Sequence, residues 1–179
     1  IDHPSAQVFS YGRTGKSTRL FITNGTFQVL TERERKAVLT FQILSIRSKY
    51  GILNYWLGAT MDLALRLSLG IERVFGLLFG WTPKLHGLLV SPWTWLLHRL
   101  MMSPRDFQRL DQATAEQVEA PEDLALALWK MESYAQTKPW SDPWVIAHMC
   151  MVSPLGRSHF HVQPPLKSRI KNLMGRYPF

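Results

Sequence analysis

Residues 7–12 and 19–23, close to the start of the chain, are two short runs that contain β-branched and aromatic residues. Residues of these types are enriched in strands, and turn residues bound the runs, so both are predicted to be strands. A polar loop joins them over residues 13–18, and Asn24 with Gly25 predicts a turn that ends the second strand. The first part of the chain therefore predicts a small antiparallel sheet.

The next segments have the start signals of helices. Thr31 and Glu34 form a capping box that opens a helix over residues 32–50. Serine caps and prolines near helix starts mark further elements downstream. These are helices over residues 103–119, 121–135 and 142–148, a strand or loop over 157–163, and a basic helix that ends near residue 174. The chain is thus predicted to be mostly helical.

Residues 51–102 form a strongly apolar and aromatic stretch. Asp62 and Arg66 interrupt its first half, and prolines interrupt its second half, so two clean transmembrane helices fit poorly. A helical hairpin that lies in or on a membrane, or packs against a membrane protein, fits better, and an ordinary buried pair of helices is the alternative. The tryptophans predicted to contact the membrane or partner are Trp56, Trp81, Trp93 and Trp95.

The composition is that of a folded protein, and the charge is strongly basic. The chain has 179 residues, 46% of them hydrophobic and 19% charged, which predicts one domain over residues 1–179 and argues against disorder. The net charge is +8, but the basic residues are spread along the chain rather than gathered in one tract. Anionic lipid headgroups therefore fit this charge as well as a nucleic acid does. Cys150 is the only cysteine, which excludes an intrachain disulfide.

Two apparent motifs do not meet the requirements of their chemistry. Residues 12–18 resemble a phosphate-binding loop, but Ser10 stands where that loop needs a glycine, and a predicted strand follows where it needs a helix. We therefore expect a polar hairpin loop rather than a nucleotide site. A second group, of possible metal ligands, has a spacing that matches no compact zinc pattern. Its members are His148, Cys150, His159 and His161.

The order of several segments is more informative than any one of them. The segments are QVFSYG at 7–12, RLFITNG at 19–25, LTERERKAVL at 30–39, and the stretches 103–111, 121–131, 147–154 and 163–170. In the same order they resemble motifs of the HtpX-type membrane zinc metallopeptidases, from N-A-F-A-x-G for the first to H-P-P-L-x-x-R-I for the last. The resemblance covers nearly the whole chain. It implies an α+β, mostly helical zincin-like fold, with a small antiparallel sheet and residues 51–102 as a membrane-associated helical hairpin.

The resemblance also implies where a zinc site would lie. In the family, the run matched by residues 30–39 leads into H-E-x-x-H, whose histidines bind zinc and whose glutamate takes a proton from the zinc-bound water. A carboxylate from a later helix completes the ligands. The matching positions here are Phe41, Gln42, Ser45 and Phe107, and the tail histidine of the family is replaced by Gln163. We therefore expect no metal, no other cofactor and no catalytic residue.

These replacements predict how the site is filled. Phenyl rings offer no lone pair, serine is a poor zinc ligand, and an amide cannot act as a general base. Phe41 and Phe107 are expected to be buried neighbours, with Gln42 at the same pocket. Asp106 cannot substitute for Phe107, because it points about 100° away on a helix. Asp111 matches a carboxylate that orients the first histidine in the family, and it is expected here to be a cap or an ion-pair residue.

The sequence therefore predicts a pseudopeptidase that serves as a scaffold, adaptor or accessory subunit. The expected location is the bacterial inner membrane or an organellar membrane, chloroplast or mitochondrial. A degenerate cleft could hold a peptide along residues 19–23 by strand pairing. One alternative is a divergent HtpX-like metalloendopeptidase with residual proteolytic activity. Another is a basic protein that binds nucleic acid or lipid headgroups.

Overall fold

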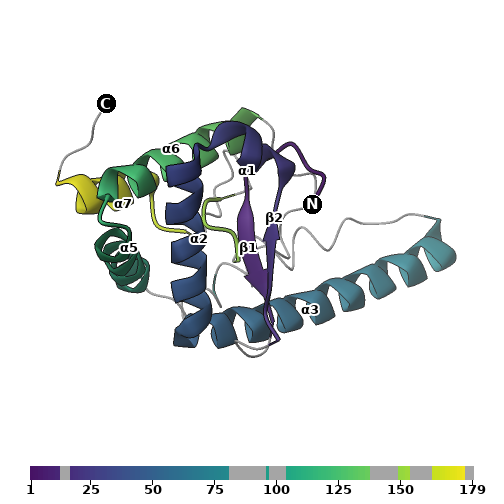
Figure 1. Cartoon of the computed structure of the whole chain (residues 1–179). Coiled ribbons are helices and arrows are strands. Elements are labelled where there is room, and N and C mark those ends of the chain that lie inside the picture. Colours follow the sequence, from purple (N-terminus) through teal and green to yellow (C-terminus); the bar gives the residue numbers. More distant parts are fainter. Residues whose placement is uncertain (13–16, 81–95, 97–103, 138–148, 154–162, 176–179) are drawn as a thin grey trace.

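The computed structural model describes residues 1–12, 17–80, 96, 104–137, 149–153 and 163–175 (Figure 1). Within them the chain is α+β and mostly helical, with one two-stranded antiparallel sheet. The elements in chain order are β1 (Val8–Tyr11), β2 (Arg19–Ile22), α1 (Asn24–Val29), α2 (Glu32–Arg47), α3 (Lys49–Phe79), α5 (Pro104–Val118), α6 (Pro121–Thr137) and α7 (Leu166–Met174). The predictions for residues 142–148 and 157–162 lie outside the described residues.

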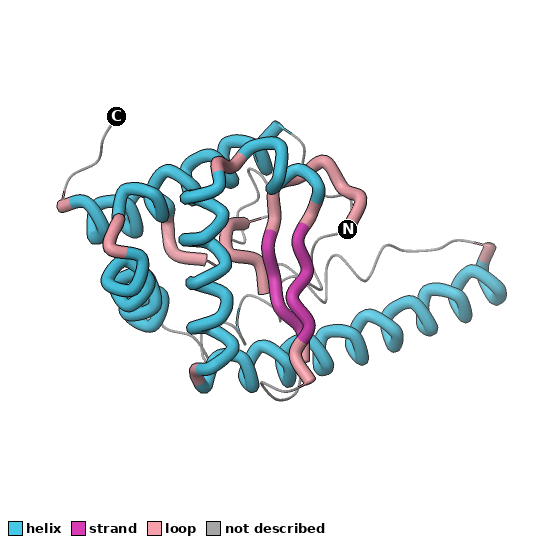
Figure 2. Tube along the Cα trace, in the orientation of Figure 1, coloured by secondary structure: helices cyan, strands magenta, loops and turns pink. Residues whose placement is uncertain are grey.

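The small sheet is packed on both faces. Val8 pairs with Ile22, and Phe9 pairs with Phe21 in the antiparallel register. Val8 belongs to the main core, whereas Phe9 stacks on Phe21 with ring centres 5.3 Å apart and packs against Met149 on the other face. Figure 2 shows the loop at 149–153 on the side of β1 opposite to β2. Both predicted strands are therefore confirmed.

A short helix follows β2, where the sequence predicted only a turn at Asn24 and Gly25. Thr23 is extended and stands at the N-cap of α1, so the chain enters a helix directly. The Thr23 hydroxyl accepts a hydrogen bond from the Gln7 amide nitrogen at 2.8 Å, which ties the start of α1 to the start of β1. A Cβ at Gly25 would lie 1.9 Å from the Pro4 carbonyl oxygen. Glycine is therefore required for this close approach, rather than for a reverse turn.

The capping box predicted from Thr31 and Glu34 is present and begins α2. Glu34 also accepts hydrogen bonds from Lys130 Nζ at 2.7 and 2.9 Å, which join α2 to α6. The helix ends at Arg47 rather than at residue 50, because Ser48 is extended and its hydroxyl donates back to the Ser45 carbonyl. A second helix, α3, then begins at once.

The main core lies between α2, α5, α6 and α7 and one face of β1 (Figure 1). Helices of this kind bury one apolar stripe each, and the stripes meet here. The fully or nearly buried side chains in the core include Val38, Phe41, Phe107, Leu110, Leu124, Leu128, Met131 and Met151. The core thus brings together residues from both ends of the sequence.

Helix α3 is continuous from Lys49 to Phe79 and projects away from this core (Figure 1). Its first turns are anchored to the rest of the protein. The ring centres of Tyr55 and Tyr11 lie 5.4 Å apart, and Leu57 and Met61 are buried. The predicted hairpin is therefore described only in its first arm, since residues 81–95 and 97–103 lie outside the described residues. No helix in the described part of the chain combines the length and the apolarity needed to cross a membrane.

Candidate functional site

Helix α2 turns the three positions matched to H-E-x-x-H toward the protein interior. Phe41, Gln42 and Ser45 are all buried, at relative exposures of 3%, 2% and 6%. Residues four apart lie on one face of a helix, so Phe41 and Ser45 share the side that faces the core. Phe107 is equally buried on the neighbouring helix α5. The expectation that both phenylalanines are buried is therefore confirmed, and both belong to one cluster.

The guanidinium of Arg169 lies against both rings. Its Cζ atom is 5.4 Å from the centre of the Phe41 ring and 5.6 Å from the centre of the Phe107 ring. Aromatic faces attract cations at this range, and more strongly when water is excluded. Phe41 and Phe107 therefore both contact the positively charged side chain of Arg169, which belongs to α7.

Arg169 is almost completely buried, yet its charge and its donors have partners. Its Nε donates to Asp111 Oδ2 at 2.9 Å, and its Nη2 donates to Asp111 Oδ1 at 2.7 Å, which makes a bidentate ion pair. Its Nη1 donates to the Met151 carbonyl oxygen at 2.7 Å. A charge buried this deeply is stable only when paired and hydrogen-bonded in this way. Asp111 is thus an ion-pair residue, as expected. We refer to Phe41, Phe107, Asp111 and Arg169 as the Arg169 cluster.

The side chains of the Arg169 cluster do not form a set of metal ligands. Its only carboxylate, that of Asp111, already binds Arg169 through both oxygens. Within the described ranges, no group of three or more histidine, cysteine, aspartate or glutamate residues could hold a metal. Nearby on α6, burial raises the pKa of Glu132, although the positive charge of Arg169 acts in the opposite direction. The arrangement has the chemistry of a structural ion pair.

Gln42 stands at the position of the family's glutamate, and its amide makes a structural hydrogen bond. Its Nε2 donates to the Val8 carbonyl oxygen of β1 at 2.9 Å, inside the protein. A glutamate carboxylate at this position has no hydrogen to donate. The amide is therefore the form of the side chain that fits the strand, and it holds α2 against β1.

Gln163 lies at the same loop as the Met151 carbonyl. Its Nε2 donates to the Cys150 carbonyl oxygen at 2.9 Å. Burial raises the pKa of the Cys150 thiol, which favours its protonated form. His148, His159 and His161 lie outside the described residues, as do residues 13–16 of the loop that resembles a phosphate-binding motif. A strand follows that loop, as expected, rather than a helix.

Sequence reasoning missed the role of Arg169, which lies in the predicted basic helix that ends near residue 174. The signal that could have found it is the motif resemblance itself, because the last motif contains an arginine at this position and an earlier one contains an aspartate at the position of Asp111. Asp106 is partly exposed, whereas Phe107 is buried, which agrees with the expected direction of the two side chains. Trp56 is 55% exposed on α3, and Trp81, Trp93 and Trp95 lie outside the described residues.

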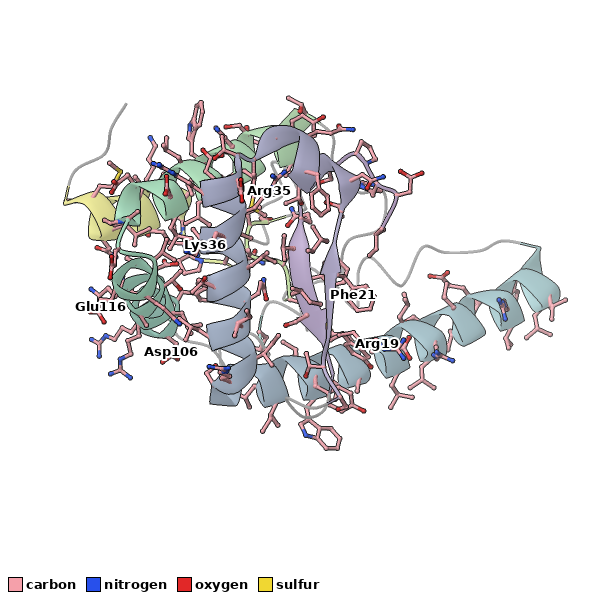
Figure 3. All side chains as sticks on the ribbon, in the orientation of Figure 1. Arg19, Phe21, Arg35, Lys36, Asp106 and Glu116 are labelled. Atoms are coloured by element: carbon pink, nitrogen blue, oxygen red, sulfur yellow. The ribbon has the colours of Figure 1, made fainter. Side chains whose placement is uncertain are left out.

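The strand proposed to hold a peptide lies apart from the Arg169 cluster. Strand β1, rather than β2, contacts α2 (Figure 1). Figure 3 shows Arg19 and Phe21 on β2, while Arg35 and Lys36 lie along α2. A peptide paired with the outer edge of β2 would therefore not lie over Phe41 and Phe107.

The chain is similar to curated proteins named "Protease HtpX homolog". The relative from Desulforapulum autotrophicum is 29% identical over 97% of this chain, that from Sulfurovum sp. is 25% identical over 97%, and that from Methylibium petroleiphilum is 27% identical over 99%. The chain spans 60%, 66% and 67% of the lengths of these relatives. No known family model matches the chain, and no solved structure does. The similarity supports a relationship to the HtpX family and to a family of proteases.

Proposed function

We propose that this chain is a catalytically inactive relative of the HtpX-type metallopeptidases, and that it serves as a scaffold, adaptor or accessory subunit at a membrane. The observation that carries the proposal is the Arg169 cluster. At two positions that the resemblance assigns to zinc ligands, phenyl rings are buried against an arginine–aspartate pair.

The chemistry of peptide hydrolysis explains why this arrangement is inactive. Zinc peptidases need a metal-bound water, a general base beside it and an open coordination position. Here the buried ring of Phe41 offers no lone pair to a metal, the amide of Gln42 cannot take a proton, and the donors of Arg169 already bind Asp111 and Met151. The contacts within this region therefore stabilise the folded protein rather than the transition state of peptide hydrolysis.

A divergent metalloendopeptidase is the second candidate function. The observation that favours it is that the relatives are named proteases and match nearly the whole chain. This candidate requires ligands from residues other than Phe41, Ser45 and Phe107.

Metal content and proteolysis, measured on one sample, separate the two candidates. We expect the purified chain to hold no stoichiometric zinc after dialysis and to leave unfolded casein intact. The Desulforapulum autotrophicum relative, purified in the same way, is the matched positive control. A content of about one zinc ion per chain that survives dialysis, together with casein cleavage that a chelator stops, would refute the inactive-relative proposal.

The membrane location rests on the HtpX resemblance and on the apolar surface of α3. Ile52, Trp56, Leu63 and Leu67 are exposed large apolar side chains on that helix. Groups of exposed large apolar side chains are typical of membrane or protein contacts. Fractionation of cells that express the chain tests this part of the proposal, and recovery in the soluble fraction alone would contradict it.

A further inference from the structure

The end of β1 meets the first half of α3 at a row of aromatic side chains (Figure 1). The ring centres of Tyr11 and Tyr55 lie 5.4 Å apart, and those of Tyr55 and Trp56 lie 5.8 Å apart. Ile52 precedes Trp56 by four residues, so both side chains lie on one face of α3. The three rings and the isoleucine therefore form one continuous surface.

Arg19 belongs to the same surface, because it is paired with Tyr11 in the sheet. Residues directly opposite each other in antiparallel strands point to one face and lie close together. The next pair on this face, Phe9 and Phe21, is stacked in that way, and Figure 3 shows Arg19 and Phe21 on β2. We call these residues the Trp56 patch: Tyr11, Arg19, Ile52, Tyr55 and Trp56.

The Trp56 patch is open to solvent although most of its area is apolar. The exposed fractions are 43% for Tyr11, 51% for Ile52 and 55% for Trp56, and Arg19 is exposed as well. Large aromatic side chains dominate the energetics of interfaces, because each one removes much apolar area from water when it is covered. The patch therefore has the apolar area that a contact surface needs.

The polar atoms of the patch are mainly hydrogen-bond donors. A guanidinium and an indole nitrogen donate and do not accept, and a phenol hydroxyl can donate. The ion pairs in the described part of the chain leave Arg19 without a carboxylate partner, whereas Asp62, further along α3, binds Arg66 at 2.8 Å. An anionic group that accepts hydrogen bonds therefore complements this surface.

The residue types of the patch favour a protein partner over a nucleic acid. Tryptophan, tyrosine and arginine are the residues most enriched among the hot spots of protein–protein interfaces. A single-stranded nucleic acid needs ring faces on which successive bases stack, and a positively charged groove along its backbone. Here the ring planes of Tyr55 and Trp56 are inclined by 76°, and Arg19 is the single cation of the patch. A carboxylate beside an apolar side chain fits this arrangement better than a run of phosphates.

We propose that the Trp56 patch docks an acidic segment of a partner protein, in which an aspartate or glutamate lies next to a large apolar side chain. The carboxylate pairs with Arg19, and the apolar side chain packs against Ile52 and Trp56. The inference rests on the adaptor role in the proposed function and names the surface and the chemistry of the partner. It does not depend on whether the chain binds zinc.

A random peptide library displayed on phage is the first test. The full chain is immobilised, and bound phage are selected and sequenced. We expect the selected peptides to share a carboxylate next to a leucine, phenylalanine or tryptophan. A parallel selection on the Trp56→Ala variant should not enrich these peptides. Selected peptides without an acidic residue, or equal enrichment on the variant, would contradict the proposal.

Fluorescence anisotropy with one selected peptide tests the contacts singly. We expect Arg19→Gln and Trp56→Ala each to weaken binding about tenfold or more, because a few hot-spot residues carry most of the affinity. The matched controls are Arg33→Gln, which removes an exposed arginine from α2, and Phe27→Ala, which removes an exposed ring from α1. Both controls should bind as the wild type does, and circular dichroism checks that every variant is folded.

A double-mutant cycle tests the assigned ion pair. Replacement of the acidic residue of the peptide by its amide should weaken binding to the wild type about as much as Arg19→Gln does. The same replacement should then cost the Arg19→Gln variant little further affinity, because the pair is already broken. Fully additive losses would show that the carboxylate does not pair with Arg19 and would overturn the proposal.

Two further outcomes would also overturn it. If an oligothymidine strand binds the wild type and loses affinity in Arg19→Gln and Trp56→Ala, the patch is a nucleic-acid site. If the wild type enriches no peptide, the patch does not dock a protein segment. Zinc content and casein cleavage are measured separately, so the inactive-relative part of the proposed function stands or fails independently of both outcomes.

Discussion

Phe41 touches the guanidinium of Arg169 on one side and belongs to the main core on the other. Truncation of a buried phenylalanine typically costs about 3–5 kcal/mol through lost burial and the cavity left behind. We expect Phe41→Ala to lower the free energy of unfolding by about this amount. Urea titration measures it, and Phe27→Ala on the exposed face of α1 is the control, expected within about 0.5 kcal/mol of the wild type. A change at Phe41 as small as that of the control would contradict the burial.

Gln42 offers a sharper test, because its family counterpart is glutamate. Gln42→Glu replaces a donor with a carboxylate opposite the Val8 carbonyl oxygen, so two acceptors face each other. The expected cost is about 1–3 kcal/mol at neutral pH. Burial and the facing carbonyl raise the pKa of the introduced carboxyl, and its protonated form can donate. The deficit should therefore shrink as the pH falls through that raised pKa, whereas Gln42→Met, used as the control, should show no such dependence.

Arg169 and Asp111 form a pair whose partners depend on each other. Arg169→Met leaves the Asp111 carboxylate buried without its bidentate partner, and broken buried pairs of this kind cost about 3–5 kcal/mol. We expect the double variant Arg169→Met, Asp111→Leu to recover most of this loss, because no uncompensated charge remains. Thermal unfolding of the two single variants and the double variant closes the cycle. Simple additivity would show that the pair is not coupled.

At the level of single residues, the sequence predicted the burial of Phe41 and Phe107 but not the cation beside them. Burial followed from the motif resemblance, which rests on local patterns. The Arg169 contact joins positions far apart in the sequence, and the sequence alone does not distinguish a buried arginine from an exposed one. Ser45 and Gln163 were placed at the site, but their contacts with Ser48 and Cys150 depend on backbone groups that a pattern does not show.

Among the secondary structure elements, the join between α2 and α6 gives the fold a dependence on acid. Burial by itself would raise the pKa of Glu34, but hydrogen bonds from Lys130 and Thr31 outweigh burial, and the net pKa is lowered. A lowered pKa in the folded state means that ionised Glu34 stabilises the fold above its ordinary pKa of 4.5 and that this stability is lost as the pH falls below that value.

We therefore expect Glu34→Gln to reduce stability by about 1 kcal/mol near neutral pH. The difference from the wild type should diminish as the pH is lowered, because protonation removes the same interaction from the wild type. Glu116→Gln on α5, outside this ion pair, serves as the control. Chemical denaturation at several pH values measures the effect, and a difference that grows in acid would contradict the assignment.

The helices that the sequence predicted best are those with a chemical start signal. The capping box at Thr31 and the prolines at positions 104 and 121 set the observed starts to within a residue. The α1 helix was missed because Asn24 and Gly25 read as a turn, and the closeness of Pro4 that explains the glycine is a tertiary contact. The break at Ser48 was missed because the sequence on both sides of it is compatible with a helix.

For the whole molecule, restoration of the family's ligand types tests the geometry of the backbone. The quadruple variant Phe41→His, Gln42→Glu, Ser45→His, Phe107→Glu supplies two histidines four residues apart and a carboxylate from α5. If α2 and α5 keep a zincin-like arrangement, added zinc should stabilise this variant by about 2.7 kcal/mol at a hundredfold excess over its dissociation constant. The wild type should show no such gain. Calorimetry with and without zinc measures the melting temperature of the variant. Equal melting temperatures in the two conditions would argue against that arrangement.

The Arg169 cluster also determines when the protein can fold. Its members come from α2, α5 and α7, and the Met151 carbonyl completes it, so the contacts span positions 41 to 169. Contacts this distant in sequence form late, because a long stretch of chain must first be brought together. A ribosome synthesises the N-terminal part first, and the rings of Phe41 and Phe107 stay without their cation until α7 has emerged. Folding of this core can therefore be completed only after α7 has been synthesised, and until then the two aromatic rings lack the contact with Arg169.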